Sequence, residues 1–285
     1  MLKERHVMNY KLLATDLDGT LANSRKEITD RNKEAILKAA AAGVRIVLAS
    51  GRPAIGQRAV RERLELTRIG GFMLACNGSH IVEYRDGREI SLRSCTVEPV
   101  LIPKICAFAR DHGVDALTYN GVGILTENPD GHYLQLEAFN CGLPLIGVEC
   151  LEETVLQAKI SAHKLVLTAA HETLAALFDE LQELLGDELN IFFSEPHFLE
   201  VTPPGIDKGT SLTWLCGHLG IDPAEMIAFG DSGNDVPMLQ LAGLGVAVEN
   251  ALPGTKAVAD CIVASNDEDG VADAIEQYVL PHSEW

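Results

Sequence analysis

The first third of the chain alternates short apolar runs with segments whose apolar residues recur at helical spacing. Apolar runs at residues 10–16, 44–50 and 72–76 predict strands, and the helical pattern falls at residues 29–43 and 54–66. Strands that are apolar on both faces are typical of a parallel sheet covered by helices on both sides. The pattern therefore predicts a doubly wound α/β sheet.

The last third of the chain resumes the same alternation. A helix is expected at residues 208–220, ahead of an apolar strand at residues 226–231. The elements expected after it are a helix at 234–243, a strand at 245–250, a short helix at 254–260, a strand at 261–265 and a closing helix at 269–280. Because the alternation is the same, we expect these elements to belong to the same sheet.

The middle of the chain has a mixed pattern. Residues 80–94 predict a hairpin that turns at Asp86-Gly87, because an Asp-Gly pair between two strands favours a tight turn. The other elements expected here are helices at 97–112, 151–158 and 171–185 and strands at 163–169, 190–195 and 197–201. We interpret this section as an α+β domain of residues 85–194, inserted into an α/β core of residues 1–84 and 195–285.

Charge and hydropathy limit the classes of function. The 285 residues include 23 basic and 41 acidic side chains, which give a formal net charge of −18. An acidic surface repels phosphate backbones, so we expect no nucleic-acid partner. We expect no membrane partner either, because no apolar run approaches the ~18 residues of a membrane span.

The cysteines and the N-terminus indicate a cytoplasmic protein. Seven cysteines, an odd number without a CxxC pair, favour free thiols over disulfides or a zinc site. The first residues contain no apolar region long enough for a signal peptide, and Met8 offers an alternative start before the first expected strand. The sequence leaves the choice between a monomer and a dimer open.

Polar clusters follow the strands expected in the core. Asp16 and Asp18 end the first strand, Ser50-Gly51-Arg52 follows the second, Asn77-Gly78-Ser79 follows the third, Gly230–Asp235 follows the strand at 226–231, and Lys208 begins a helix. Open α/β sheets bind ligands outside the carboxyl ends of their strands. We therefore expect these groups to meet at one edge of the sheet.

Three carboxylates are expected at that edge. Asp16 and Asp18 stand two residues apart in an extended chain, so both point to the same side, and Asp231 arrives from another strand. Neighbouring carboxylates repel and need a cation or a shared proton. Hard oxygen ligands favour Mg²⁺. A calcium loop is excluded because Gly19 stands fourth in the pattern, where that loop needs its glycine sixth.

The same residue types suit phosphoryl transfer. Asp16 can attack phosphorus and form an aspartyl-phosphate, while Asp18 can protonate the leaving oxygen and later take a proton from water. The Ser50 hydroxyl, backbone N–H groups and the Lys208 ammonium would hold the oxygens of the transferred group. Taken alone, each cluster is also explained without any function, as a turn, a helix cap or a surface lysine. Their combination on successive strand ends favours a catalytic site.

These clusters resemble the motifs of a known family. The segments "DLDGTL", "SGR", "DKG" and "GDSGND" resemble, in order and strand placement, the four motifs of the haloacid dehalogenase (HAD) superfamily of phosphatases. The inserted section resembles the α+β cap of Cof-type, class IIB members, so the likeness covers nearly the whole chain. The resemblance implies a Rossmann-like HAD core with an inserted cap domain, Mg²⁺ as cofactor, and an active site between core and cap, where the cap selects the substrate.

The resemblance also implies a role for each motif residue. Asp16 would be the nucleophile and a metal ligand, Asp18 the acid–base and a metal ligand through its backbone carbonyl, and Asp231 the acidic metal ligand. Phosphate would be bound by Leu17, Ser50, Gly51, Lys208 and Asn234, with Asp235 and Asn77 in support. The family often has "NGA" where this chain has "NGS", a change that leaves Asn77 in place.

The expected function is Mg²⁺-dependent hydrolysis of small phosphorylated metabolites, either sugar phosphates or phosphorylated cofactors. A phosphomutase is the alternative on the same scaffold, because it would use Asp16 and return the phosphoryl group to a substrate hydroxyl. It would need a more basic cap than residues 85–195, which hold many acids and few arginines. A non-enzymatic binding or regulatory domain is the third reading, although this chain keeps every chemical group of the motifs.

Overall fold

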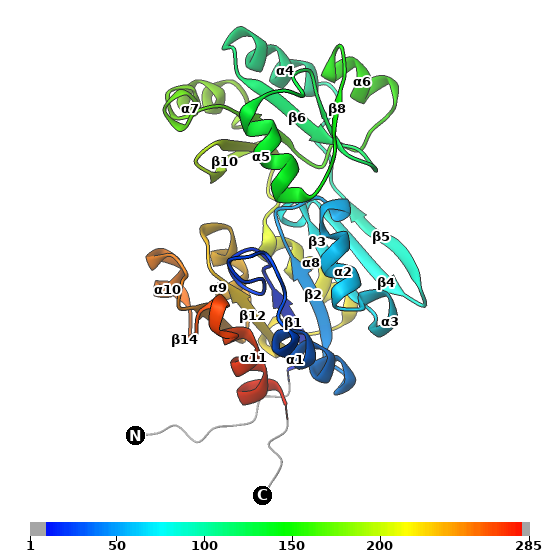
Figure 1. Cartoon of the computed structure of the whole chain (residues 1–285), viewed down its shortest axis with the longest axis vertical. Coiled ribbons are helices and arrows are strands. Elements are labelled where there is room, and N and C mark those ends of the chain that lie inside the picture. The colour runs from blue at the N-terminus through cyan, green and yellow to red at the C-terminus, as the bar shows by residue number, and fades with distance from the viewer. Residues whose placement is uncertain (1–9, 281–285) are drawn as a thin grey trace, which may run out of the picture. The chain divides into compact units, whose positions relative to one another are not determined.

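The computed structural model describes residues 10–280, which form two compact units. The first unit contains the described residues up to Ser50, Ala59–Leu92 and those from Asp207 onward, and the second contains Gly51–Arg58 and Arg93–Ile206. Figure 1 labels helices and strands of both units. The N-terminal residues on which the signal-peptide and Met8 expectations rest lie outside the described part of the chain.

The first unit is built on an eight-stranded sheet with the order β14-β13-β12-β1-β2-β3-β4-β5. Its strands are β1 (Leu12–Thr15), β2 (Arg45–Ala49), β3 (Gly71–Ala75), β4 (His80–Arg85), β5 (Arg88–Ser94), β12 (Met226–Gly230), β13 (Leu244–Val248) and β14 (Cys261–Val263). Neighbours from β14 to β3 are parallel, and β4 is antiparallel to β3. The doubly wound α/β core is therefore confirmed, with β1 between β2 and β12.

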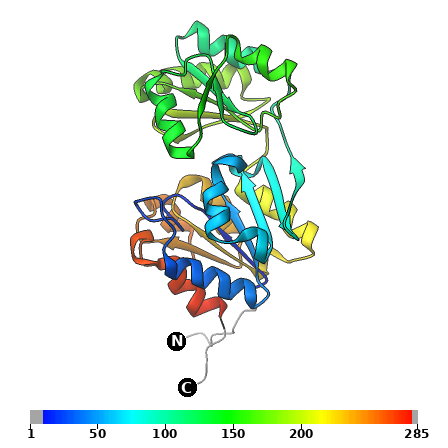
Figure 2. The same ribbon diagram turned by 45° about the vertical axis from the view of Figure 1, so that its right-hand side comes forward.

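Helices cover the sheet of the first unit. They are α1 (Asp30–Ala41), α2 (Arg58–Arg63), α3 (Leu66–Ile69), α8 (Lys208–Leu219), α9 (Val236–Leu241), α10 (Pro253–Val258) and α11 (Gly270–Ala274). Leu12 and Ala14 on one face of β1 pack with Leu212 of α8 and Met238 of α9. Figures 1 and 2 show α11 beside α1. This packing anchors α8 so that its first residue, Lys208, lies in the core of the unit.

Two expected helices are interrupted. The segment 54–66 forms a 3₁₀ turn at Ala54–Gln57 and then α2, and Glu65 takes a left-handed conformation (φ 54°) before α3. The closing segment is α11 followed by a π-helical turn at Ile275–Val279. Both segments keep their apolar spacing in the sequence, but local backbone changes divide them.

The second unit contains a six-stranded sheet with the order β10-β11-β9-β6-β7-β8. Its strands are β6 (Asp115–Tyr119), β7 (Ile124–Thr126), β8 (Leu145–Gly147), β9 (Leu165–Thr168), β10 (Asn190–Glu195) and β11 (Phe198–Thr202), and its helices are α4 (Ile102–Asp111), α5 (His132–Cys141), α6 (Leu151–Gln157) and α7 (His171–Leu185). One apolar cluster joins the sheet to α4, α6 and α7, and another joins it to α5.

The units divide the chain at positions that differ from the expected 84/85 and 194/195. The hairpin strand β5 belongs to the eight-stranded sheet, and the boundary falls near its end, because the longer segment of the second unit starts at Arg93. The first unit resumes at Asp207. The segment Gly51–Arg58 joins the second unit because Ile55 packs against an apolar cluster there. All seven cysteines are free thiols. Within residues 10–280, no helix is long and apolar enough to cross a bilayer.

Candidate active site

The end of β1 holds Asp16 within the sheet. The strand stops at Thr15, yet the Asp16 N–H still donates to the Phe229 carbonyl of β12 at 3.0 Å. The Thr15 hydroxyl donates to the Asp16 carbonyl at 2.8 Å. The Asp16 backbone is therefore fixed on both sides, and its side chain is 9 % exposed. A carboxylate held in this way is preorganised for chemistry at the strand end.

The turn after Asp16 approaches the end of β12 closely. Gly19 has a positive φ of 84°, and a Cβ at this position would lie 2.6 Å from Asp231 Oδ2. Only glycine leaves room for this approach and takes this conformation without strain. The next residue, Thr20, donates its hydroxyl hydrogen to Asp231 Oδ1 at 2.7 Å. Thr20 lies inside the motif "DLDGTL", but the sequence pattern alone does not assign it this contact.

Lys208 lies between two carboxylates at the start of α8. Asp207 caps the helix by accepting from the Thr210 N–H at 2.7 Å. The fully buried Lys208 Nζ donates to Asp16 Oδ1 and to Asp235 Oδ1, both at 2.6 Å. Burial alone would lower the pKa of Lys208, but the charges of Asp16 and Asp235 outweigh it and raise the pKa. Lys208 is therefore a fixed cation of this site.

Asp235 organises the loop after β12. Its side chain is fully buried, and Oδ2 accepts from the backbone N–H groups of Asp231 and Ser232, both at 3.0 Å. Gly230 makes room for it, since a Cβ there would lie 2.4 Å from Asp235 Cβ. Both oxygens of Asp235 are thus used within the protein, one by Lys208 and one by the loop. This agrees with a supporting role, in which both oxygens are engaged within the protein.

A second polar chain runs through the strand ends. The Asn77 N–H donates to the Ser50 carbonyl at 3.0 Å, and the Asn234 side-chain amide donates to Asn77 Oδ1 at 2.9 Å. Asn77 takes a left-handed conformation (φ 55°), which asparagine tolerates better than most residues. Ser232 Oγ in turn donates to Asn234 Oδ1 at 2.8 Å. The "NGS" and "GDSGND" motifs therefore meet, as the strand-end argument predicts.

Three of the predicted site residues have less defined places. Leu17 is almost fully buried, and Asp18 is half-buried and forms an isolated bridge with Ala22. Gly51 belongs to the second unit, so its position is described apart from the motif residues of the first unit. Their assignments as phosphate-binding or acid–base residues remain predictions.

The arrangement concentrates negative charge. Carboxylate oxygens of Asp16, Asp231 and Asp235 all lie within 4.8 Å of one another. Burial raises the pKa of Asp16 well above its usual range; Lys208 opposes the rise, and Asp235 and Asp231 add to it. Because one ammonium does not balance three carboxylates, a divalent cation fits this cluster. The cluster contains Asp235 in place of the expected Asp18, whose predicted contact is through a backbone carbonyl.

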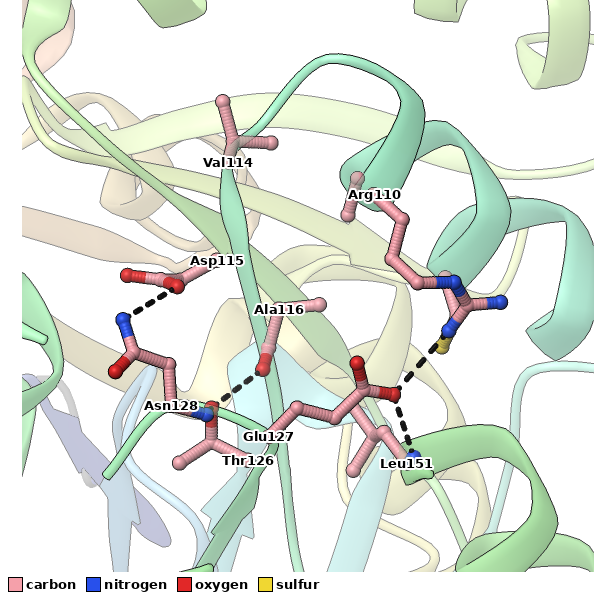
Figure 3. A pocket seen from close by; sticks show the side chains of 10 residues that line it. Arg110, Val114, Asp115, Ala116, Thr126, Glu127, Asn128 and Leu151 are labelled. Atoms are coloured by element: carbon pink, nitrogen blue, oxygen red, sulfur yellow. Dashed lines mark hydrogen bonds and ion pairs between the residues drawn. The ribbon is translucent and has the colours of Figure 1, made fainter. Parts of the chain in front are cut away.

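A second acidic group, in the second unit, does not have these properties. Glu127, Cys150 and Glu152 lie together, but Arg110 pairs with both glutamates. Glu127 also accepts from the Leu151 N–H at 2.8 Å, at the start of α6. Figure 3 shows the contacts of Glu127 with Arg110 and with the Leu151 N–H. These residues line a cavity of about 50 Å³. Both glutamates have partners within the protein, the Arg110 guanidinium for both and the helix N–H for Glu127, which favours a structural cluster.

Comparison with known proteins gives a consistent result. A model of the haloacid dehalogenase-like hydrolase family matches residues 13–275. The 5-amino-6-(5-phospho-D-ribitylamino)uracil phosphatase YcsE of Bacillus subtilis is 32% identical over 284 residues, which cover 98% of this chain and 100% of that protein. The pyridoxal phosphate phosphatase YbhA of Escherichia coli is 27% identical over 282 residues, 96% of this chain and 100% of that protein.

One relative is much longer than this chain. The chloroplastic endoribonuclease YBEY of Arabidopsis thaliana is 30% identical over 277 residues, which cover 95% of this chain but 47% of that protein. The chain therefore spans about half the length of that relative, and the activity in its name belongs to the longer protein.

Solved structures share the fold over nearly the whole chain. A haloacid dehalogenase-like hydrolase from Bacteroides thetaiotaomicron has a TM-score of 0.87 and 38% identity, and covers 94% of this chain and 99% of its own. The HAD subclass IIB sugar phosphatase BT4131 has a TM-score of 0.75 and 24% identity, and covers 94% of this chain and 98% of its own. At that identity the second likeness concerns the fold alone.

Proposed function

The chain belongs to the haloacid dehalogenase-like hydrolase family, and we propose that it is a phosphatase that hydrolyses small phosphorylated metabolites through an aspartyl-phosphate on Asp16. The observation that carries this proposal is the position of Asp16. Its backbone is held between β1 and β12, and its buried carboxylate lies 2.6 Å from Lys208 Nζ. Family membership supports the reaction class.

Asp16 needs its ionised form to act as a nucleophile. Burial works against that form, and the Lys208 ammonium favours it. In the first step Asp16 would attack phosphorus, and the bond between phosphorus and the leaving oxygen would break. Asp18 would protonate that oxygen and afterwards take a proton from the water that cleaves the aspartyl-phosphate. The first step leaves Asp16 phosphorylated and Asp18 deprotonated, and the second step returns both to their starting forms, so the cycle closes.

The remaining motif residues would hold the phosphoryl group. We assign this role to Ser50 and Asn234, together with Lys208 and the backbone of Leu17 and Gly51. The Asn77–Asn234 hydrogen bond supports the assignment, because it fixes the Asn234 amide at the strand ends. Fixed donors around a developing charge are the usual source of electrostatic stabilisation. The contact between Lys208 and Asp16 means that this lysine would serve both the nucleophile and the phosphate.

We propose Mg²⁺ as the cofactor, held by Asp16, Asp231 and the Asp18 carbonyl. The donor set fits this ion, because Asp16 and Asp231 are hard carboxylate ligands with more negative charge around them than Lys208 balances. When bound, the ion would supply positive charge that keeps both carboxylates ionised and offsets the charge of the incoming phosphate. Asp235 would stay outside the coordination shell, because Lys208 and the loop N–H groups occupy its oxygens.

The substrate class follows from the relatives. YcsE and YbhA are named for phosphorylated small molecules and match this chain over nearly its full length. We propose the same class here, sugar phosphates or phosphorylated cofactors, and propose that the second unit acts as a cap that selects among them. We also propose a cytoplasmic location, which the seven free thiols support.

The test is phosphate release from a panel of sugar phosphates, nucleotides and phosphorylated cofactors, with Mg²⁺ and with a chelator. Asp16→Asn should abolish release while the far-UV circular dichroism spectrum stays unchanged. Asp115→Asn in the second unit is the matched control, and it should leave release intact. Release that persists in Asp16→Asn would refute the nucleophile, and full release in chelator would refute the metal. If no compound releases phosphate, the phosphatase proposal fails.

A further inference from the structure

The loop after β1 is held by asparagines from distant parts of the chain. We call residues 17–23 the Asp18 loop. Asn250 Nδ2 donates to the Gly19 carbonyl at 2.7 Å, Asn32 Nδ2 to the Leu21 carbonyl at 3.2 Å, and Asn266 Nδ2 to the Ala22 carbonyl at 2.9 Å. Buried carbonyl groups need a donor, and here side-chain amides provide it in place of a strand or helix partner.

Two of these amides, those of Asn250 and Asn32, are also held through their oxygens, so their orientation is determined. The Asn266 N–H donates to Asn250 Oδ1 at 3.0 Å, and the Ala272 N–H donates to Asn32 Oδ1 at 3.0 Å. An oxygen that accepts in this way directs the NH₂ group of the same amide toward the loop. Asn266 therefore acts twice, once on Ala22 directly and once on Gly19 through Asn250. We call Asn32, Asn250 and Asn266 the amide clamp.

The clamped residues are neighbours of two groups in the proposed mechanism. Asp18 directly precedes Gly19, and Thr20, which donates to Asp231, follows it. Inside the loop, the Ala22 N–H donates to the Leu17 carbonyl at 2.8 Å and closes a tight turn. A shift of the Ala22 peptide would therefore move this turn and Asp18 with it. The hydrogen bonds of the amide clamp and of this turn together restrict the backbone of the Asp18 loop.

The segment that follows the Asp18 loop borders a hollow. Asn23 and residues 25–30 line this hollow of about 550 Å³, which also reaches Val60 and Arg63. Along the same segment, Asp267 Oδ1 accepts from the Ser24 N–H at 2.8 Å. Within the Asp18 loop, Leu17, Leu21 and Ala22 are almost fully buried, so packing and the amide hydrogen bonds together hold the chain after Asp18. Removing one amide leaves a buried carbonyl group without its donor, which is costly even where the packing remains.

We infer that Asn266 and Asn250 are positioning residues that act through the Asp18 loop to hold Asp18 against the leaving oxygen. This inference rests on the proposed function for its catalytic part. Asn266 is the sharper test of the two, because its side chain is almost fully buried and water does not replace it, whereas Asn250 is exposed. Asn266→Ala removes the hydrogen bond to Ala22 and keeps the backbone N–H that holds Asn250.

The first readout is the dependence of kcat/KM on the leaving group. An aryl phosphate such as p-nitrophenyl phosphate leaves as a stable anion and needs little protonation, whereas an alkyl phosphate needs a general acid. In Asn266→Ala we expect kcat/KM to fall about 10-fold or more for the best alkyl phosphate of the panel, and less than about 3-fold for p-nitrophenyl phosphate. An equal fall for both substrates would overturn the inference, because a merely structural loss does not distinguish leaving groups.

The second readout, backbone hydrogen exchange, needs no activity. Exchange at Ala22 should become about 5-fold faster in Asn266→Ala, the effect of one lost hydrogen bond, while β1 and α8 keep their protection. Unchanged exchange would overturn the inference. Asp267→Ala is the control, since it removes a contact to Ser24 beyond the loop and should change neither the leaving-group ratio nor the exchange of Ala22. A wild-type protein that hydrolyses neither substrate would refute the proposed function, and the exchange result would still decide whether Asn266 holds the loop.

Discussion

Two aspartates in the loop after β12 should respond in opposite ways to the same substitution. Asp235 is fully buried, and its oxygens accept from Lys208 and from the backbone N–H groups of Asp231 and Ser232. Burial raises the pKa of Asp231; the Thr20 hydrogen bond opposes the rise, and the charge of Asp235 adds to it. In the metal-free protein we expect Asp235→Asn to lower the free energy of unfolding and Asp231→Asn to leave it unchanged or raise it.

The contacts set the size of each effect. Asparagine at position 235 has one oxygen, so it satisfies either Lys208 or the two loop N–H groups. Breaking a buried ion pair and leaving the other charge without a partner costs about 3–5 kcal/mol. Lys208 keeps Asp16 as a partner, so the loss in Asp235→Asn should lie at or below this range, which is still a large part of the ~5–15 kcal/mol that stabilises a typical domain. Asparagine at position 231 still accepts from Thr20 and removes a charge that burial disfavours. That change should stay within about 1 kcal/mol of zero or be stabilising.

Guanidinium unfolding in the presence of a chelator measures the difference. Trp214 lies on α8, six residues after Lys208, and packs against the core of the first unit, so its fluorescence reports that unit. The free energy of unfolding follows from the linear dependence on denaturant. Equal destabilisation by the two substitutions, or no effect of Asp235→Asn, would refute the division of roles between these aspartates.

Three other outcomes are expected. Mg²⁺ in excess should raise the unfolding midpoint of the wild type and not that of Asp231→Asn; a rise in both would exclude Asp231 as a ligand. The pKa values of Asp16 and Asp231 are raised in the folded state, so the folded protein binds a proton at each carboxylate more tightly than the unfolded chain does. Protonation of these groups therefore stabilises the fold at low pH, and the stabilisation is lost as pH rises. Metal-free unfolding midpoints should therefore fall between about pH 4 and pH 7, and less steeply in Asp231→Asn; equal slopes would contradict the assignment. Lys164 Nζ and Glu200 Oε1 form a buried ion pair at 2.7 Å in the second unit. Lys164→Met should therefore lower the free energy of unfolding by about 3–5 kcal/mol, whereas the double variant Lys164→Met/Glu200→Leu should lower it much less. Equal losses in the two variants would show that the unpaired charge is not the cause.

Elements with strong periodicity and local caps could be predicted from the sequence. The helix expected at 171–185 is α7, and α1 lies within the expected 29–43, where the Thr29 side chain caps it by accepting from the Asn32 N–H. The helix α5 (His132–Cys141) was not anticipated. It has no side-chain cap, and its apolar residues do not lie on one face, since Leu134 is buried and Phe139 is 77 % exposed. Its position depends on tertiary packing, which a local pattern does not encode.

The candidate site was predictable wherever the sheet topology alone brings residues together. Asp16 and Asp231 follow neighbouring parallel strands, so the strand-end rule places them at one edge. The exact partner atoms were not predictable, because they depend on side-chain conformations and on contacts between distant segments. Thr20 reaches Asp231 across 211 positions, and Asn266 reaches Ala22 across 244. The sequence alone does not distinguish Asn266 from an ordinary turn asparagine, because its partner Ala22 is identified only by the three-dimensional structure.

Lys208 forms ion pairs with two of the three clustered aspartates, and this choice determines which carboxylate lacks an ion pair with it. Its ammonium is 2.6 Å from both Asp16 and Asp235, whereas Asp231 accepts from the neutral hydroxyl of Thr20. Both oxygens of Asp235 accept hydrogen bonds from the protein, so its charge serves the fold. Asp231 is half-buried, and burial disfavours its charge. If Asp231→Asn keeps its stability, as predicted above, Asp231 has the property that the proposed metal ligand requires. Asp16 shares features with both aspartates. Like Asp235 it is paired with Lys208, and like Asp231 it has an oxygen in the cluster where we propose the cation. A nucleophile needs this combination, since it must remain ionised in a buried site and still face an anionic substrate.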